Sequence, residues 1–192
     1  SLKYINVLNQ NGIEKVCQIK HGVDQAFFQT VPSFPNSSKL IVGAVGRSYK
    51  STSRKNEKLL KKISELDFVD FHFTGGKIKE SDMPKFYSEC HIIVQASLVE
   101  GGSMAITEGL ASGVPILCYS GVGVADEFEH GVIKVPFNNE EAFIKRIKDY
   151  WANKEFLKFG EPSIIKLLRS QVEDHSWKNF ADAHDNIWSK LA

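Results

Sequence analysis

No apolar run in this sequence approaches the roughly 20 residues that a membrane-spanning helix needs, and the N-terminal residues lack the basic and apolar segments of a secretory signal. Neither positive nor negative charge is in clear excess. Twenty-four lysines and arginines face 23 acidic residues, which gives a formal net charge of +1. No general positive field therefore favours nucleic acid as a partner. We expect a cytoplasmic domain in which any anion-binding site is local.

Cysteines and metal-binding patterns are sparse as well. Cys17, Cys90 and Cys118 are far apart and lie in or beside apolar runs, which predicts reduced, buried thiols. The histidines beyond residue 50 are scattered without metal-ligand spacing, and no Asp-x-Asp pair follows a strand. We therefore expect no metal and no cofactor. These histidines are His72, His91, His130, His175 and His184.

Two common catalytic signatures are missing too. No Gly-x-Gly-x-x-Gly follows the first core strand, which disfavours hydride transfer with a dinucleotide. No Gly-x-Ser-x-Gly elbow is present either, which disfavours a serine hydrolase.

The sequence does contain a regular alternation of short apolar runs and longer amphipathic stretches. The apolar runs predict strands at 15–22, 39–46, 68–76, 90–97, 114–120 and 131–136. The amphipathic stretches predict helices at 56–66, 83–90, 102–113 and 140–152. This alternation is typical of an α/β domain with a parallel sheet flanked by helices.

Beyond about Lys154 the pattern becomes purely helical, over 154–159, 162–171 and 176–192. The sequence therefore predicts a helical C-terminal tail. We interpret the chain as three parts on these patterns and on its Pro- and Ser-rich stretch. They are the end of a preceding domain with a crossover segment (1–29), a linker (30–38) and the main α/β domain with its C-terminal helices (39–192).

In an open parallel sheet, ligands bind outside the carboxyl ends of the strands, so the loops after the strands carry the information about function. The most informative is SLVEGGSMAITEGLASGVP, residues 97–115. Gly101 and Gly102 remove side chains just before a helix, whose free N–H groups attract phosphate. A tight turn with Ser103 as helix cap is the alternative interpretation. Glu100 and Glu108 stand eight residues apart, so both carboxylates can face one crevice.

This stretch resembles the signature of the large family of retaining GT-B glycosyltransferases, of the group 1 or family 4 type, which includes glycogen synthases. In that family two glutamates bracket seven residues, and here the pair is Glu100 and Glu108. The match continues to Pro115, which makes it more specific than a lone glycine loop. The resemblance implies a Rossmann-like fold, the C-terminal half of a GT-B enzyme, that binds a nucleotide sugar.

The resemblance also implies roles for individual residues. Glu108 is expected to accept hydrogen bonds from the ribose hydroxyls, a role that suits an acceptor-only carboxylate. Glu100 is expected beside the donor sugar, where it positions or electrostatically supports the reacting group. The residues at the helix start are expected to meet the diphosphate, chiefly through backbone N–H groups. They are Gly101, Gly102, Ser103 and Met104.

Departure of a nucleoside diphosphate needs fixed cations. Arg47 follows Gly46 at the end of the first core strand, as in the family's Gly-Arg loop, and an arginine fork can hold two phosphate oxygens. The family's nearby lysine is assigned to Lys55, which precedes Asn56 where the family often has glycine. The loop is longer here, so Lys50 and Arg54 remain alternatives.

Weaker matches extend the resemblance to about 16–188. Tyr87 lies in a helix before a strand and is interpreted as a core residue. Gly121–Gly123 and Glu127 follow a strand and are candidates for contact with the donor sugar. HGVD at 21–24 resembles the crossover strand, and the helix after Ser176 and Trp177 resembles the last helix of the family.

We therefore expect a transferase that moves a sugar from a nucleoside-diphosphate sugar to an acceptor hydroxyl, with retention, in polysaccharide or glycoconjugate biosynthesis. The acceptor is a saccharide, a lipid-linked glycan or another hydroxyl compound. A preceding GT-B domain is expected as the other wall of the cleft, and it could attach the protein to the inner face of the membrane. The alternative is a non-catalytic module that binds nucleotide sugars.

Overall fold

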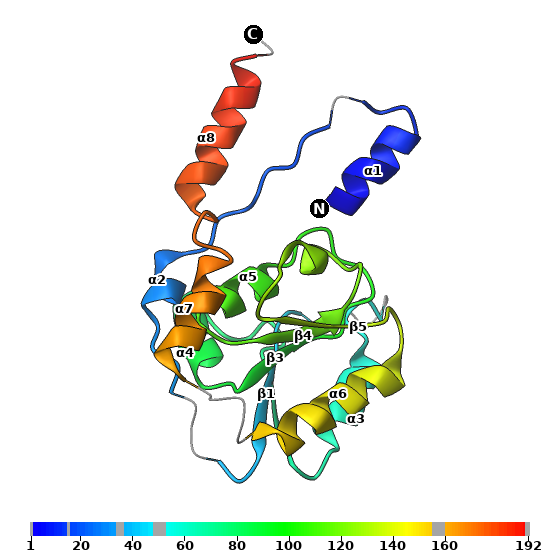
Figure 1. Ribbon diagram of the computed structural model, residues 1–192, viewed down its shortest axis with the longest axis vertical. Helices are drawn as coiled ribbons and strands as arrows, with labels where there is room; N and C mark the ends of the chain where they lie inside the picture. The colour runs from blue at the N-terminus through cyan, green and yellow to red at the C-terminus, as the bar shows by residue number, and fades with distance from the viewer. Residues whose placement is uncertain (1, 15, 34–36, 48–52, 155–159, 191–192) are drawn as a thin grey trace.

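A parallel sheet in the order β2-β1-β3-β4-β5 forms the centre of the molecule (Figure 1). The computed structural model describes residues 2–14, 16–33, 37–47, 53–154 and 160–190. The strands are β1 (Leu40–Ala44), β2 (Val69–Phe73), β3 (Ile92–Gln95), β4 (Ile116–Tyr119) and β5 (Val132–Val135). The prediction of an α/β domain with a parallel sheet is therefore confirmed.

Helices connect the strands and cover both faces of the sheet, as right-handed crossover connections require. The α-helices of the body are α2 (Gln25–Gln29), α3 (Glu57–Ser64), α4 (Met83–Ser88), α5 (Met104–Ala111), α6 (Glu140–Ala152) and α7 (Pro162–Ser170). The short 3-10 helices η1 (Glu80–Asp82) and η2 (Ala125–Glu127) lie in the loops between these elements. The predicted helices at 56–66, 83–90, 102–113 and 140–152 are thus confirmed.

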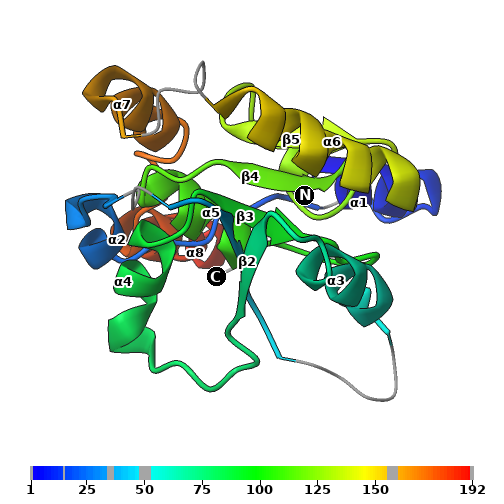
Figure 2. The ribbon, with the colours of Figure 1, turned by 90° about the horizontal axis from the view of Figure 1, so that it is seen from below.

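Two separate cores lie on the two faces of the sheet. One contains Leu59 from α3 and Phe143 from α6, and the other contains Ile106 from α5 and Leu168 from α7. Figure 2 shows α3 and α6 grouped on one side and α2, α4, α5 and α7 grouped on the other. All four residues of β3 are buried, which explains why this strand is a continuous apolar run in sequence up to Gln95.

The segment before β1 differs from the sequence-based expectation. The run at 15–22 was expected to be a strand, but residues 16–24 form no strand. An apolar run becomes a strand only where a neighbouring strand offers hydrogen bonds, and the parallel ladders in the described part of the chain do not include this segment. Cys17 within it is exposed, so the expectation of a buried thiol is wrong there, whereas Cys90 and Cys118 are buried as expected.

The segment that follows packs into the body. Val23, just before α2, and Phe27 within α2 are buried in the core on the α5 face of the sheet. Asp24 begins α2, and its carboxylate accepts a hydrogen bond from the N–H of Ala26 at 2.8 Å. The division at residues 30–38 into linker and main domain stays a prediction.

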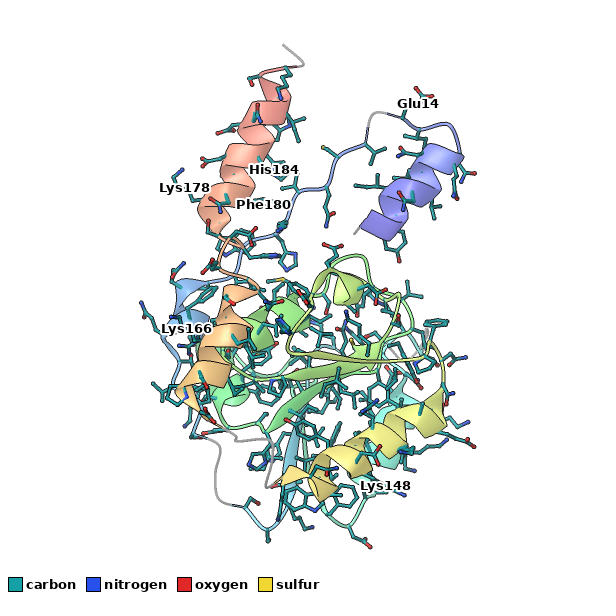
Figure 3. All side chains as sticks on the ribbon, in the orientation of Figure 1. Glu14, Lys148, Lys166, Lys178, Phe180 and His184 are labelled. Carbon is teal, nitrogen blue, oxygen red and sulfur yellow. The ribbon has the colours of Figure 1, made fainter. Side chains whose placement is uncertain are left out.

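The two terminal helices extend beyond the layers. Figure 1 shows α1 (Leu2–Gln10) and α8 (Trp177–Trp188) on the same side of the body. No residue of α8 is buried, and Figure 3 shows Phe180 and His184 on this projecting helix. The helical tail is confirmed for 162–170 and 177–188, whereas the expected helix at 154–159 lies largely outside the described residues. Among the described residues, no helix has the length and apolar character to cross a bilayer.

We expect the α5 face of the sheet to contribute strongly to stability. Leu110 of α5 is completely buried, so Leu110→Ala should lower the free energy of unfolding by about 2–5 kcal/mol through lost burial and a cavity. Leu167 on α7 is 40% exposed, and Leu167→Ala should cost less than about 1 kcal/mol. Urea denaturation of the two variants measures both values. Equal losses would contradict the placement of α5 in the core.

Candidate functional site

The strand order creates a switch point between β1 and β3. The chain runs from β1 to its neighbour β2 and then returns across β1 to form β3. The connections leaving β1 and β3 therefore diverge to opposite sides of the sheet, and open α/β folds bind ligands outside the carboxyl ends of two such strands. The loop after β1 carries Arg54 and Lys55, and the loop after β3 carries Glu100.

These two loops meet through an ion-pair cluster. Arg54 Nη2 donates to Glu100 Oε2 at 2.6 Å, and Lys55 Nζ donates to Glu100 Oε1 at 2.5 Å. The Glu100 side chain is only 5% exposed. Burial by itself raises the pKa of this carboxyl, but the two cations outweigh it and hold the pKa below its ordinary value. Glu100 is therefore an ionised carboxylate with both oxygens occupied.

Two hydrogen bonds to backbone carbonyl oxygens fix the same contact. The Leu98 N–H donates to the Arg54 carbonyl oxygen at 3.0 Å, and Arg54 Nε donates to the Val99 carbonyl oxygen at 3.1 Å. Asn56 has a left-handed conformation and caps α3 by accepting from the Leu59 N–H at 3.3 Å. This cap sets the direction in which the chain enters α3, and so helps to place Lys55 beside Glu100.

Gly46 and Arg47, the predicted Gly-Arg pair, lie at the same end of the sheet. A Cβ on Gly46 would be 2.9 Å from Cε of Lys55, so Gly46 and Lys55, both predicted site residues, are in contact. Arg47 is exposed and lies against Gly76, where a Cβ would be 2.5 Å from its Cγ. Lys50, the remaining alternative for the phosphate-binding lysine, lies outside the described residues.

The start of α5 leaves its backbone accessible. Gly101 and Gly102 are exposed, and a Cβ on Gly101 would meet no atom within 4 Å. Ser103 is buried and stands at the N-cap position of α5, as the alternative interpretation expects, but its side chain makes no capping hydrogen bond. Met104, the first residue of α5, is exposed. Free N–H groups with open space before them are suited to an anion.

The glycine-rich turn after β4 contacts the same loop. Gly123 has a positive φ of 61°, and a Cβ there would be 3.2 Å from Cβ of Glu100. This places one of the Gly121–Gly123 candidates next to Glu100. Glu127 instead accepts a hydrogen bond from Gln18 Nε2 at 2.8 Å. At the outer side of the loop, the Tyr4 hydroxyl of α1 donates to the Glu100 carbonyl oxygen at 3.1 Å.

Glu108 has different surroundings from Glu100. Its Oε2 accepts a hydrogen bond from the Tyr87 hydroxyl of α4 at 2.7 Å, and its side chain is partly exposed. Burial raises its pKa, the Tyr87 hydrogen bond lowers it, and the nearby charge of Glu80 raises it, with a net upward shift. The two glutamates therefore have different partners: Glu100 contacts the cations after β1, and Glu108 contacts the Tyr87 hydroxyl of α4. Tyr87 is fully buried, which confirms it as a core residue.

His21 is a site residue that sequence reasoning did not single out. Its Nε2 lies 3.0 Å from Oγ1 of Thr107 on α5, and a Cβ on Gly102 would be 3.6 Å from its Nδ1. Burial lowers its pKa, so the neutral ring is favoured. The HGVD motif was the available signal, but it was interpreted as a crossover segment. Among the described residues, no group of three or more His, Cys, Asp and Glu is arranged to hold a metal ion.

Solved structures share this architecture. The chain superposes on a glycosyltransferase from Rickettsia africae with a TM-score of 0.71 at 18% identity, over 97% of this chain and 62% of that one. HepE from Anabaena, solved in complex with UDP, gives a TM-score of 0.72 at 15% identity, over 99% and 62% of the two chains. Sucrose-phosphate synthase from Thermosynechococcus elongatus gives 0.70 at 18% identity, over 97% and 56%. The fold is that of the Rossmann-like C-terminal domain of GT-B glycosyltransferases.

The sequence also matches the family described as Glycosyl transferases group 1 over residues 19–159. This match covers most of the chain, and the protein belongs to that family. The chain spans 56–62% of the length of the three similar structures.

The opposite pKa shifts of the two glutamates predict opposite effects of pH on stability. Because the folded pKa of Glu100 is below its ordinary 4.5, its contribution is present above that value and is lost as pH falls through the folded pKa. Because the folded pKa of Glu108 is raised, its contribution is present below 4.5 and is lost as pH rises through the folded pKa.

Urea denaturation from about pH 3 to about pH 7 tests this. The stability of the wild type relative to Glu100→Gln should increase as pH rises, and its stability relative to Glu108→Gln should decrease. Changes of the same sign for both variants would contradict the assigned surroundings.

Proposed function

We propose that this chain is the nucleotide-sugar-binding half of a retaining glycosyltransferase. It would transfer a sugar from a nucleoside-diphosphate sugar to an acceptor hydroxyl in polysaccharide or glycoconjugate biosynthesis. The observation that carries the proposal is the cluster of Arg54, Lys55 and Glu100 at the switch point, directly before the exposed Gly101-Gly102 start of α5. Family membership supports the same reaction class.

The diphosphate would bind where Glu100 now sits. Two cations and one carboxylate leave one net positive charge, to which the start of α5 adds a partial positive charge. A diphosphate carries more negative charge than one carboxylate and has more acceptor oxygens. It would therefore draw Lys55 and Arg54 away from Glu100 and stabilise the leaving group as charge develops in the transition state. Arg47, exposed at the end of β1, would supply a further cation.

Glu100 would then turn to the donor sugar. Once a diphosphate holds the cations, its carboxylate is free to accept from sugar hydroxyls or to support positive charge on an oxocarbenium-like ring. Gly123 lies against Cβ of Glu100 and contributes no side chain at that point. Glu108 would accept hydrogen bonds from the ribose diol.

The product, the acceptor domain and the location of the protein are proposed by analogy with the family. The UDP complex of HepE supports a nucleoside diphosphate as the bound product. A preceding domain would form the acceptor side of the cleft, for a saccharide, a lipid-linked glycan or another hydroxyl compound. The reaction would need no metal or other cofactor, because protein cations face the leaving group. The protein would act in the cytoplasm or at the inner face of the membrane.

Binding of nucleotides to Lys55 variants tests the proposal. Lys55→Gln should weaken binding of a nucleoside diphosphate by about tenfold to a hundredfold, because a charge-assisted hydrogen bond is worth about 1.5–3 kcal/mol. Binding of the matching nucleoside should be unchanged. Lys58→Gln, on the exposed side of α3, is the matched control and should have little effect. Isothermal titration calorimetry with UDP, GDP and ADP and their nucleosides measures each value.

Equal weakening of nucleoside and diphosphate by Lys55→Gln would exclude a phosphate role for Lys55. Transfer must be measured on the full-length protein. If that protein binds nucleotide sugars but transfers no sugar, the chain is a binding module and the enzyme proposal fails.

A further inference from the structure

Tyr87 presents a polar group inside an otherwise apolar core. The ring is completely buried, and it packs edge-to-face on Phe27 of α2 at 5.6 Å and on Phe86 at 5.9 Å between ring centroids. A phenylalanine would fill this space equally well. The hydroxyl is satisfied by one strong contact, the 2.7 Å hydrogen bond to Oε2 of Glu108.

This hydrogen bond fixes one side of the Glu108 carboxylate. A carboxylate has two oxygens and about four acceptor directions, and a long glutamate side chain on a helix can rotate among several orientations. Tyr87 engages Oε2 from the buried side, while the Glu108 side chain retains partial exposure. The hydrogen bond therefore fixes the Glu108 carboxylate on its buried side and leaves its remaining acceptor directions for a ligand.

We infer that Tyr87 is a positioning residue, whose hydroxyl orients Glu108 to accept hydrogen bonds from the ribose diol of the bound nucleotide. The inference rests on the proposed function. Tyr87 does not touch the ligand and acts only through Glu108, so its effect is confined to the part of the affinity that comes from the ribose hydroxyls.

The charge state of Glu108 depends on the same contact. A protonated carboxyl loses acceptor capacity, so the ribose needs the ionised form. Burial and the charge of Glu80 on η1 raise the pKa of Glu108, whereas the Tyr87 hydroxyl on α4 lowers it. Removing that hydroxyl should therefore raise the pKa further, and removing the Glu80 charge should lower it.

The test compares ribose recognition in the whole chain with and without the hydroxyl. Calorimetry first identifies which of UDP, GDP and ADP the wild type binds most tightly, and then compares it with its 2′,3′-dideoxy analogue. Tyr87→Phe should reduce the preference for the ribonucleotide about five- to twentyfold and leave affinity for the dideoxy analogue unchanged. Phe27→Leu, which disturbs the packing of the ring without removing the hydroxyl, is the control and should leave the preference intact.

The pH dependence of that preference is the second readout. Dividing the two affinities cancels the titration of the diphosphate itself. The wild-type preference should fall as pH is lowered and Glu108 becomes protonated. Tyr87→Phe should move this fall to higher pH, and Glu80→Gln should move it to lower pH. Glu80 is exposed, so Glu80→Gln leaves the core around Tyr87 intact and measures the effect of a neighbouring charge on Glu108 separately.

The outcomes separate the two proposals. An unchanged preference in folded Tyr87→Phe, or equal loss of affinity for both analogues, overturns the positioning role alone. Failure of Glu80→Gln to move the pH dependence contradicts control of Glu108 by its charged surroundings. If the wild type binds none of the nucleoside diphosphates, the proposed function fails and the positioning role fails with it.

Discussion

The contact between Glu100 and the cations Arg54 and Lys55 is the interaction on which the site depends. Removing a carboxylate from water is costly, and only close, well-directed cations compensate for that loss. With 5% of the Glu100 side chain exposed, both oxygens receive such cations at 2.5–2.6 Å. The contact joins the loop after β1 to the loop after β3. It therefore fixes the conformation of the loop that leads into α5.

The two glutamates of the 97–115 motif have opposite electrostatic surroundings, and this difference separates their functions. Glu100 has a lowered pKa because cations hold it ionised, whereas Glu108 has a raised pKa because burial and the charge of Glu80 outweigh the hydrogen bond from Tyr87. An ion-paired carboxylate can exchange its cations with an incoming anion. A carboxylate oriented by a phenol is suited to accepting neutral hydroxyls, as a ribose presents them. Glu100 lies just before α5 and Glu108 lies within it, and the Gly101-Gly102 segment between them is exposed.

Much of the fold could be predicted from the sequence, because strands buried on both faces are continuous apolar runs and the helices have clear periodicity. The run at 15–22 has the same composition as the true strands, yet whether it joins a sheet depends on a neighbour that local sequence does not reveal. The site motif was visible for a similar reason: glycines and glutamates between a strand and a helix are a local pattern. The side chains that contact the two glutamates could not be predicted from the sequence. Choosing between Arg54 and Lys55 required the path of a long loop, and both contact Glu100. The Tyr87 hydroxyl finds Glu108 only through the packing of α4 on α5.

The central claim is that Glu100 occupies cations that a diphosphate would take over, and the affinity of Glu100→Gln for nucleoside diphosphates tests it most directly. The amide removes the competing negative charge but keeps the size of the side chain. Calorimetry should therefore show tighter binding of the diphosphate than in the wild type and unchanged binding of the nucleoside. Weaker or equal binding of the diphosphate by a folded Glu100→Gln variant would contradict the claim.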